Sequence, residues 1–523
     1  MLTQTKTINF LLQLLLVIVL CSIFLYGVCV AGLVFKEPDI CFLLAMGRWI
    51  FENGVVPTQD PFSYTQAHLT SAKPYVVYQW LYEVICYGIV KVAGGTGLLV
   101  LSAGILIFSF FVVPMRAFAR AGNRGCFALL VSMLVLFSSL SHISVRPELF
   151  SFLFLAIILD QLSRLKSEEN KASDEHKVDR TFVFICVTIA CLWANIHVLF
   201  VLLFALLIFL LSVQIFAKLF LGAKLAKNFY TILLATLLSF FATLLNPYGF
   251  TIWNHTIRII LDPINKTINE LFPLGAEAWQ SPVYYPFLLL SIIALIALVK
   301  TFRSGITGAN DFFFRFLIPI FIGLAFQSRR LVPISVLILA VSLASGSMLQ
   351  SNSNEGESFF SKFNARLSTA FNSLSPIWAS AMIFLAGLGA YLTSVYIMPP
   401  SIPQGSAAFS VPAGAIKYIA SNPLSGRLLN DAHYGAVLIW QLVPSPKIFV
   451  DPRYFLYDTK HMSDYWDMVL ARNSWQNLLK EYRIDCIFLP ANTPLVKTLS
   501  THPDWQILYK DDTAAILKLR NVR

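Results

Sequence analysis

The sequence predicts a polytopic α-helical membrane protein with a soluble α/β domain at its C-terminus. Of its 523 residues, 57% are hydrophobic and only 13% are charged, and the mean hydropathy is +0.69. Such values are untypical of soluble globular proteins. The apolar residues form runs of about 17–25 residues, the length that crosses a bilayer as a helix. From about residue 401 the runs give way to short strand and helix patterns.

About eleven transmembrane helices are expected. They lie near residues 10–34, 97–118, 125–142, 147–164, 181–196, 198–220, 229–245, 284–300, 312–328, 331–349 and 376–398. The first run is too long for the hydrophobic region of a signal peptide, so we expect a retained helix. The segment 80–93 is too short to cross and is expected to lie against the membrane, ending at Gly94-Gly95.

Basic residues set the expected orientation. With the N-terminus in the cytoplasm, the inner connections hold about twice as many Lys and Arg as the outer ones, as the positive-inside rule requires. The net charge of +11 therefore gives no reason to expect nucleic-acid binding, and no basic block with interleaved aromatics stands out. We expect a multi-pass protein of a bacterial inner membrane. Its membrane domain would span 1–400, with a long first outer loop at 36–96, and its periplasmic domain 401–523.

The C-terminal domain reads as helices and strands in alternation. Helices are expected near 412–421, 434–442, 462–470 and 473–482, and strands at 427–430, 447–450, 485–489, 505–509 and 514–519. This order predicts a small, mostly parallel sheet. No glycine-rich nucleotide motif occurs in it. Asp451-Pro-Arg453 directly follows a predicted strand, where it would make either a ligand contact or a turn held by an Asp–Arg pair.

The first outer loop carries more chemistry than a plain connector. Asp39 follows the first apolar run by a few residues, and Asp60 and Glu83 come later in the same stretch. Ionisable groups near apolar segments are costly, about 2.5–3.5 kcal/mol each at mid-bilayer, and are functional candidates by default. These three acids are therefore the predicted catalytic residues. The alternative is an ordinary interfacial loop with an aromatic belt.

Further polar residues fall on the same expected outer side of the membrane. The candidates for binding a donor phosphate are Arg146, His197, Arg329 and Arg330, and those for binding an acceptor or sugar are Trp49, Trp80, Glu277 and Trp279. Most have a simpler explanation. Arg329 and Arg330 would snorkel to lipid headgroups, His197 would be a satisfied interfacial histidine, Arg146 would pair with Glu148, and the tryptophans would anchor at the interface. Their common sidedness is what indicates one site.

These residue types suit group transfer from a lipid phosphate. A carboxylate, best placed at Asp39, would take the proton of an acceptor hydroxyl or amine. Arginines would neutralise the leaving phosphate, because the guanidinium has a fixed charge and a bidentate fork. Asp60 or Glu83 would orient the acceptor or share a divalent metal. The cysteines form no zinc-type spacing, so the sequence identifies no cofactor with certainty.

Several motifs extend this interpretation. They are PDICFLLAMGRWIFENGVVPTQDPFSYT, YQWLYE, RPELFSF, LWANIH, LNPYG, EAWQSP and FVDPR. Together with the helix and domain order, they resemble the GT-C integral membrane glycosyltransferases, which include protein O-mannosyltransferases and lipid A aminoarabinose transferases. The resemblance implies a polyprenyl-phosphate-linked sugar donor, an inverting periplasmic transfer to a glycan, lipid or protein, and a catalytic acid at Asp39. Relatives often have adjacent acids in this loop, whereas this chain has Glu37-Pro38-Asp39, which leaves the partner acid and the metal open.

Two other classes of function compete with transfer. A transporter or flippase for lipid-linked glycans would have charged or broken helices near mid-membrane and an internal repeat, and neither is evident in the sequence. A non-catalytic membrane scaffold, with the C-terminal domain as its binding module, would leave the shared sidedness of the acids and arginines unexplained.

Overall fold

Contacts divide the chain into two compact units. The computed structural model describes residues 39–65, 75–122, 126–142, 144–169, 178–222, 225–262, 271–275, 277–302, 308–345, 412–442, 447–472 and 474–520. Unit 1 comprises Met1–Val34 and Leu99–Pro399, and unit 2 comprises Phe35–Leu98 and Pro400–Arg523. The first outer loop therefore belongs to the same unit as the C-terminal domain.

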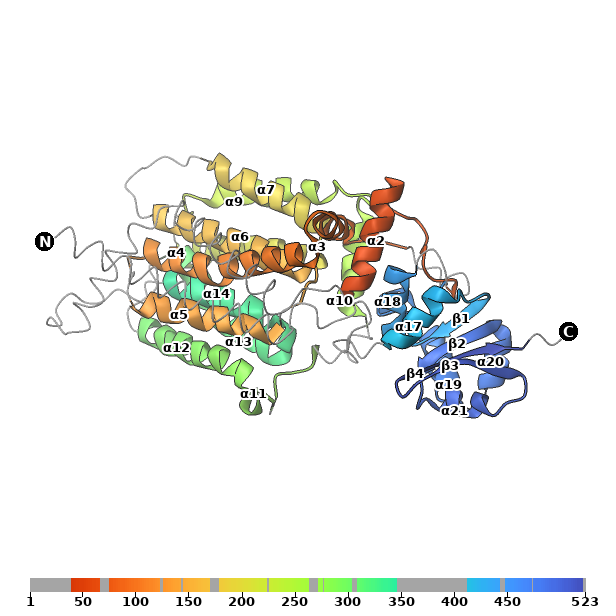
Figure 1. Cartoon of the computed structure of the whole chain (residues 1–523). Helices are drawn as coiled ribbons and strands as arrows, with labels where there is room; N and C mark the ends of the chain where they lie inside the picture. The colour runs from red at the N-terminus through yellow and green to blue at the C-terminus, as the bar shows by residue number, and fades with distance from the viewer. Residues whose placement is uncertain are drawn as a thin grey trace, which may run out of the picture. The chain divides into compact units, whose positions relative to one another are not determined.

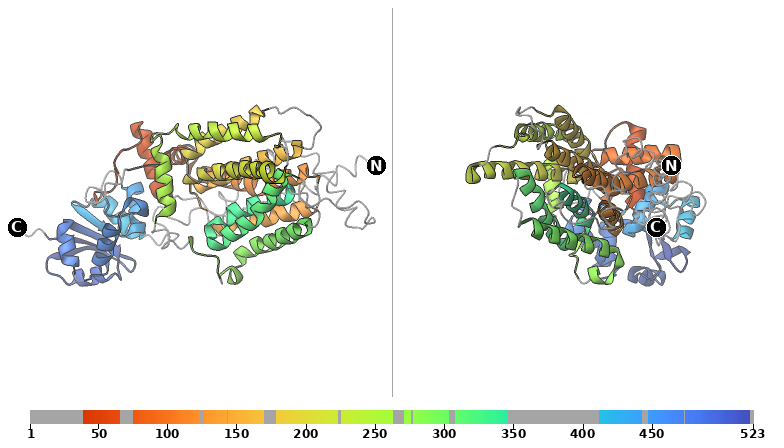
Figure 2. Two further views of the ribbon diagram at one scale, coloured as in Figure 1. Left: turned by 180° about the vertical axis from the view of Figure 1, so that it is seen from behind. Right: turned by 90° about the vertical axis from the view of Figure 1, so that its left-hand side faces the viewer.

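All secondary-structure elements described in unit 1 are helices (Figure 1). Its elements are the end of α3 (Trp80–Ile107), the π-helix η3 (Phe108–Val112), α4 (Val113–Arg120), α5 (Cys126–Ser138), η4 (Ser139–His142), α6 (Glu148–Glu169), α7 (Arg180–Ala194), η5 (Val198–Phe200), α8 (Val201–Leu221), α9 (Phe229–Thr243), α10 (Thr251–Leu261), α11 (Glu277–Gln280), η8 (Pro282–Tyr284), α12 (Tyr285–Phe302), α13 (Ala309–Gln327), η9 (Arg329–Leu331) and α14 (Val332–Ser345). Most long helices run alongside one another, whereas α10 crosses their direction (Figures 1 and 2).

Nine of the eleven predicted spans coincide with these helices, and the other two, 10–34 and 376–398, lie outside the described residues. Within the part of the chain that the structure describes, four helical stretches are long and apolar enough to cross a membrane: Trp80–Arg120, Val198–Phe220, Pro282–Thr301 and Ala309–Gln327. Three shorter apolar helices accompany them. The chain is thus a helical membrane protein, while the count of about eleven spans is not confirmed.

Helix α14 forms the centre of unit 1. Every residue from Val332 to Ala344 is buried, and the helix packs against α4, α5, α6, α12 and α13. A helix that is apolar on all sides is stable only when other helices surround it. By contrast, α8, α9 and α12 expose large apolar side chains such as Leu219, Phe241 and Val299, as surfaces that face lipid do.

Ion pairs tie together helix ends that the sequence assigns to the cytoplasmic side. Asp160 on α6 accepts a bond from Arg120 at 2.7 Å and lies 3.2 Å from Arg116. On α13, Asp311 contacts both Arg315, at 2.7 Å, and Lys166, at 3.0 Å. Some of the basic residues behind the predicted orientation are therefore paired with neighbouring acids, so they also stabilise the helix bundle.

In unit 2, the first outer loop is more helical than predicted. Asp39–Asn53 forms α2, and Asp39 lies in its first turn, where a carboxylate interacts favourably with the helix dipole. The expectation of a loop at Asp39–Asn53 is wrong, because the apolar residues of this helix are buried on several sides and hide the helical periodicity. The predicted break is confirmed: Gly94 has φ 61° and interrupts α3 between two helical parts.

The C-terminal domain holds a four-stranded sheet of order β1-β2-β4-β3. Its elements are α17 (Ala413–Ser421), β1 (Arg427–Asn430), α18 (Ala432–Gln441), η12 (Tyr454–Leu456), α19 (Thr459–Val469), α20 (Trp475–Glu481), β2 (Ile484–Pro490), α21 (Pro494–Ser500), β3 (Trp505–Lys510) and β4 (Ala514–Leu519). Only β1 and β2 pair in parallel, and the other two pairs are antiparallel. The prediction of a mostly parallel sheet was therefore wrong.

The predicted strand at 447–450 is not part of this sheet. The backbone N–H of Ile448 donates to the Phe62 carbonyl at 3.1 Å, and the N–H of Tyr64 donates to the Ile448 carbonyl at 3.3 Å. Thr65 adds a hydroxyl bond to the Phe449 carbonyl at 2.8 Å. This segment thus uses its backbone groups to bind the first outer loop, and so is not free to extend the sheet.

Candidate functional site

Asp39 is the first residue of α2 and is partly exposed. Two contacts hold this helix within unit 2. Gly47 lies so close to the carbonyl of Glu83 on α3 that a β-carbon there would collide with it. On another side, Arg48 donates to the carbonyl of Trp440 at 2.9 Å, and its guanidinium lies 4.8 Å from the Trp440 ring centre. The C-terminal domain therefore helps to position the helix that carries Asp39.

Asp60 is joined to the C-terminal domain by a buried ion pair. Arg453 donates from Nη1 and Nη2 to the two oxygens of Asp60, both at 3.0 Å. It also donates to Asp451, from Nε at 3.0 Å and from Nη2 at 2.6 Å. Burial disfavours the guanidinium charge, but the carboxylates of Asp451 and Asp60 hold the pKa of Arg453 well above its usual value. The Asp–Arg pair expected in the 451–453 turn is present, and the same arginine also fastens the first outer loop.

The acceptor capacity of Asp60 is largely used. Beyond Arg453, its carboxylate accepts from the backbone N–H groups of Phe62 at 3.3 Å and Ser63 at 3.2 Å. The Tyr75 hydroxyl adds a longer bond of 3.4 Å. These donors offset the cost of burying the carboxylate and leave its oxygens little capacity to contact a substrate.

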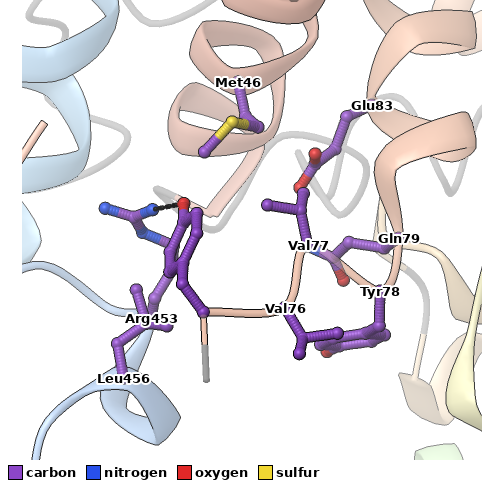
Figure 3. A pocket seen from close by; sticks show the side chains of 9 residues that line it. Met46, Val76, Val77, Tyr78, Gln79, Glu83, Arg453 and Leu456 are labelled. Atoms are coloured by element: carbon purple, nitrogen blue, oxygen red, sulfur yellow. Dashed lines mark hydrogen bonds between the residues drawn. The ribbon is translucent and has the colours of Figure 1, made fainter. Parts of the chain in front are cut away.

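Glu83 lines a small pocket within unit 2 (Figure 3). Its side chain is 2% exposed, and its Oε1 accepts from Gln79 Nε2 at 3.1 Å. Figure 3 shows the carboxylate directed between Met46 and Val77, with Arg453 on the opposite wall. Arg453 thus pairs with Asp60 and lines the same pocket as Glu83.

In unit 1, residues from three separate segments of the chain lie together. Glu148, at the start of α6, forms an ion pair with Arg330. The Nε2 atom of His197 lies 4.0 Å from Glu148 Oε1. Behind the histidine, Trp193 Nε1 donates to Ser151 Oγ at 2.8 Å, and Ser151 Oγ lies 2.8 Å from His197 Nδ1.

This arrangement determines the state of His197. Since Trp193 can only donate, the Ser151 hydroxyl hydrogen is available to Nδ1, which assigns the remaining proton to Nε2, facing Glu148. Burial lowers the pKa of His197 to about 3, so the ring is neutral at physiological pH. The permanent positive charge in this cluster therefore comes from Arg330 and not from the histidine.

The other predicted phosphate-binding residues lie nearby in the chain. Arg329 donates its backbone N–H to the Phe272 carbonyl at 3.2 Å, and its guanidinium lies 5.9 Å from the Phe272 ring centre. Arg146 is partly exposed and precedes α6. The Asn195 side chain donates to the Leu245 carbonyl at 2.9 Å, which connects the turn before α8 to the turn that follows α9.

The predicted acceptor-binding residues are scattered. Trp49 on α2 and Trp80 at the start of α3 are partly buried in unit 2. Glu277 begins α11 in unit 1, and Trp279 on the same helix is 69% exposed. The structure does not gather these four residues into one cluster within either unit.

The predicted site residues come from both units. Asp39, Asp60 and Glu83 belong to unit 2, whereas the predicted phosphate-binding residues belong to unit 1. Sequence reasoning did not single out Ser151, although it lies within the RPELFSF motif, or Tyr75, and it did not connect Arg453 with Asp60. Within the described residues, no group of three or more His, Cys, Asp or Glu side chains could hold a metal ion.

Comparison with known proteins bears on the fold. No protein-family profile and no curated protein matches this sequence. Among solved structures, the oligosaccharyltransferase AglB of Archaeoglobus fulgidus, in complex with an inhibitory peptide and a dolichol-phosphate, is similar with a TM-score of 0.60 at 9% identity. The similarity covers 91% of this chain and 69% of AglB.

Two further structures are similar. A second structure of the Archaeoglobus enzyme, tethered to an acceptor peptide, has a TM-score of 0.55 at 11% identity over the same shares of both chains. ArnT from Cupriavidus metallidurans in the apo state has a TM-score of 0.48 at 12% identity, over 99% of this chain and 98% of ArnT. The resemblance read from the motifs is confirmed at the level of architecture: the chain has the GT-C fold of integral membrane glycosyltransferases.

Proposed function

We propose that this chain is a membrane glycosyltransferase that moves a sugar from a polyprenyl-phosphate donor to a periplasmic or lipid acceptor. The observation that carries the proposal is the GT-C fold, which extends over 91% of the chain in the comparison with AglB. AglB was solved with a dolichol-phosphate and a peptide, so a protein of this fold binds a lipid phosphate. The proposed location is a bacterial inner membrane, with the N-terminus in the cytoplasm and the C-terminal domain in the periplasm.

Asp39 is the proposed general base. It takes the proton from the acceptor hydroxyl or amine while the acceptor atom attacks the anomeric carbon on the face opposite the phosphate. The bond from the anomeric carbon to the phosphate oxygen breaks, and the configuration inverts. The proton ends on Asp39, and the negative charge ends on the released polyprenyl phosphate. Its place in the first turn of α2, partly exposed, suits a base that must reach a substrate.

Arg329 and Arg330 are the proposed partners of the departing phosphate, because guanidinium groups bind phosphate oxygens in a bidentate manner. Arg146 is a further cation for this step. His197 is neutral in its cluster, so its proposed contribution is a hydrogen bond and not a charge. Trp49, Trp80, Glu277 and Trp279 remain candidates for contact with the sugar or acceptor.

The role proposed for Asp60 changes with the geometry. Its carboxylate is engaged by Arg453 and by two backbone amides. We therefore assign Asp60 to holding the first outer loop in place instead of to orienting the acceptor or sharing a metal. Glu83, whose second oxygen is not used in this way, is the acid that we propose for contact with a substrate group.

The test is the substitution Asp39→Asn, measured as release of polyprenyl phosphate and formation of glycosylated product by mass spectrometry. Loss of a general base typically costs 10²–10⁴-fold in rate, so we expect transfer to fall by about that factor while the melting temperature stays unchanged. Asp39→Glu should retain part of the activity. The control Glu52→Gln changes an exposed acid on the same helix and should be fully active.

Full activity in Asp39→Asn would remove the assigned role from this residue. Absence of any polyprenyl-phosphate release from the wild-type protein, supplied with lipid-linked sugars of several kinds, would instead remove the proposed activity. Lipid and glycan profiles of a deletion strain would identify the acceptor: a missing glycan, lipid or protein modification that returns with the wild-type gene but not with the Asp39→Asn gene.

A further inference from the structure

The pocket beside Glu83 has a distinctive lining. It is formed by Met46, Tyr75, Val76, Val77, Tyr78, Gln79, Glu83, Arg453 and Leu456, all of which belong to unit 2. Most of its wall is apolar, and the pocket has room for about one group of the size of a water molecule. It therefore suits the tip of a ligand and not a whole sugar ring.

The pocket contains a buried carboxylate oxygen to which no described residue donates a hydrogen bond. Glu83 Oε1 accepts from Gln79, but Glu83 Oε2 is buried and has no hydrogen-bond partner among the described residues. Burying a polar atom without a partner is costly, and more so for a charged group. A group that binds here should therefore present N–H or O–H donors to this oxygen.

The local charge favours a cation. Among the lining residues, Arg453 is the only one with a fixed positive charge, and its guanidinium is already shared by Asp60 and Asp451. Burial disfavours the ionised form of Glu83, and a cation that enters the pocket would favour that form by balancing its charge. With Glu83 ionised, the group would hold three carboxylates and one guanidinium, and an anion such as a phosphate would be repelled.

An ammonium group fits this site better than a metal ion. Calcium and magnesium need about six oxygen ligands, and the described residues contain no cluster that could supply them. A primary ammonium is compact and carries three donors. The apolar side chains of Met46, Val77 and Leu456 can contact the carbon chain that carries it.

We propose that this pocket binds the protonated primary amine of a small polar ligand, with Glu83 as its counter-ion. The amine could be carried by an amino sugar or by the ethanolamine headgroup of a phospholipid. Binding depends on the pocket alone and does not require that the protein transfers a sugar.

Methylammonium is the simplest probe. We expect methylammonium chloride at tens of millimolar to raise the melting temperature of the full chain in detergent more than equal concentrations of sodium chloride or tetramethylammonium chloride. Tetramethylammonium has the same charge but no N–H donors. Glu83→Gln keeps the shape of the side chain and removes its charge, so the methylammonium Kd obtained from the concentration dependence should weaken at least about tenfold. Glu481→Gln, at an acid whose side chain is 61% exposed, should behave like the wild type.

A second variant keeps the test decisive if Glu83→Gln folds poorly. Val77→Phe narrows the pocket and leaves the carboxylate intact, and it should also abolish the methylammonium effect. The proposal is overturned if methylammonium stabilises the wild type no more than sodium does, or if a folded variant of either kind still responds as the wild type does.

The source of the amine can be separated in the same assay. Glucosamine compared with glucose tests an amino sugar, and nanodiscs of phosphatidylethanolamine compared with phosphatidylcholine test a lipid headgroup. A wild-type protein that binds methylammonium but never releases polyprenyl phosphate would support the amine site and refute the proposed transferase activity. A protein that releases polyprenyl phosphate but does not respond to methylammonium would refute the amine site alone.

Discussion

The substitution Arg453→Met tests whether one guanidinium holds the first outer loop to the C-terminal domain. Arg453 is the counter-ion of Asp60 and Asp451, whose side chains are 1% and 0% exposed. Methionine fills similar space but leaves two buried carboxylates without a positive charge. Removing one partner of a buried ion pair costs about 3–5 kcal/mol. At about 2–4 °C for each kcal/mol in a domain of 150–250 residues, the melting temperature of unit 2 should fall by roughly 6–20 °C.

Companion variants make the prediction specific. Asp60→Asn removes one charge and keeps the hydrogen-bonding shape, so it should cost less, about 1–3 kcal/mol. The triple replacement Asp60→Asn, Asp451→Asn and Arg453→Met removes every charge of the group and should recover much of the loss, because neutral replacements of whole buried ion pairs are often tolerated. Arg453→Lys keeps the charge but not the fork, and should fall between the wild type and Arg453→Met.

Thermal unfolding of the full chain in detergent, followed by tryptophan fluorescence, measures all four variants. Limited proteolysis supplies an independent signal, since an unfastened first loop should be cleaved faster. An Arg453→Met protein that melts within about 1 °C of the wild type, or no lower than Asp60→Asn, would refute the view that Arg453 balances both acids.

Three further predictions concern other contacts. Gly47→Ala should lower the free energy of unfolding by about 1–3 kcal/mol, because its β-carbon would collide with the backbone of α3. Gly88→Ala on α3, with open space around it, should be neutral or stabilising. Equal effects of the two variants on the melting temperature would argue against the close approach of α2 to α3. Burial lowers the pKa of His461 to about 4, below its unfolded value of about 6.5, so its contribution to stability is complete above pH 6.5 and should decline by up to about 3 kcal/mol as the pH falls to 4. A His461→Phe protein with the same pH dependence of melting would contradict this. Arg330→Gln leaves the buried Glu148 without its charge partner and should lower the melting temperature more than Glu148→Gln. The double variant should lose less than the sum of the two by at least about 0.5 kcal/mol, and strict additivity would show that the pair is not coupled.

Local patterns in the sequence were sufficient for much of the fold. The apolar runs located nine helices of unit 1, because hydrophobic length is a property of consecutive residues. Gly94-Gly95 marked the break in α3, because a positive φ is accessible to glycine at little cost. Four of the five strands predicted in the C-terminal domain were also found.

Other features escaped the sequence because they depend on partners far along the chain. Asp39–Asn53 is a helix whose apolar residues face several neighbours at once, so no single hydrophobic stripe revealed it. The strand predicted at 447–450 pairs instead with the first outer loop, since Ile448 bonds with Phe62 and Tyr64. The residues of a segment indicate its tendency to be extended, but they do not indicate which other segment will pair with its backbone.

The sequence by itself determined the class of protein, its helical spans, the presence of the appended α/β domain and the residue types suited to group transfer. Only the tertiary structure decided which of those residues are engaged in hydrogen bonds and ion pairs within the protein. Asp60 and Arg453 are 393 positions apart, and their pairing engages a carboxylate that the sequence presents as a candidate catalytic acid. The same fold leaves one oxygen of Glu83 without a partner among the described residues. The reason is physical: a carboxylate looks the same in every sequence, and its chemistry is set by which donors the packed chain brings to it.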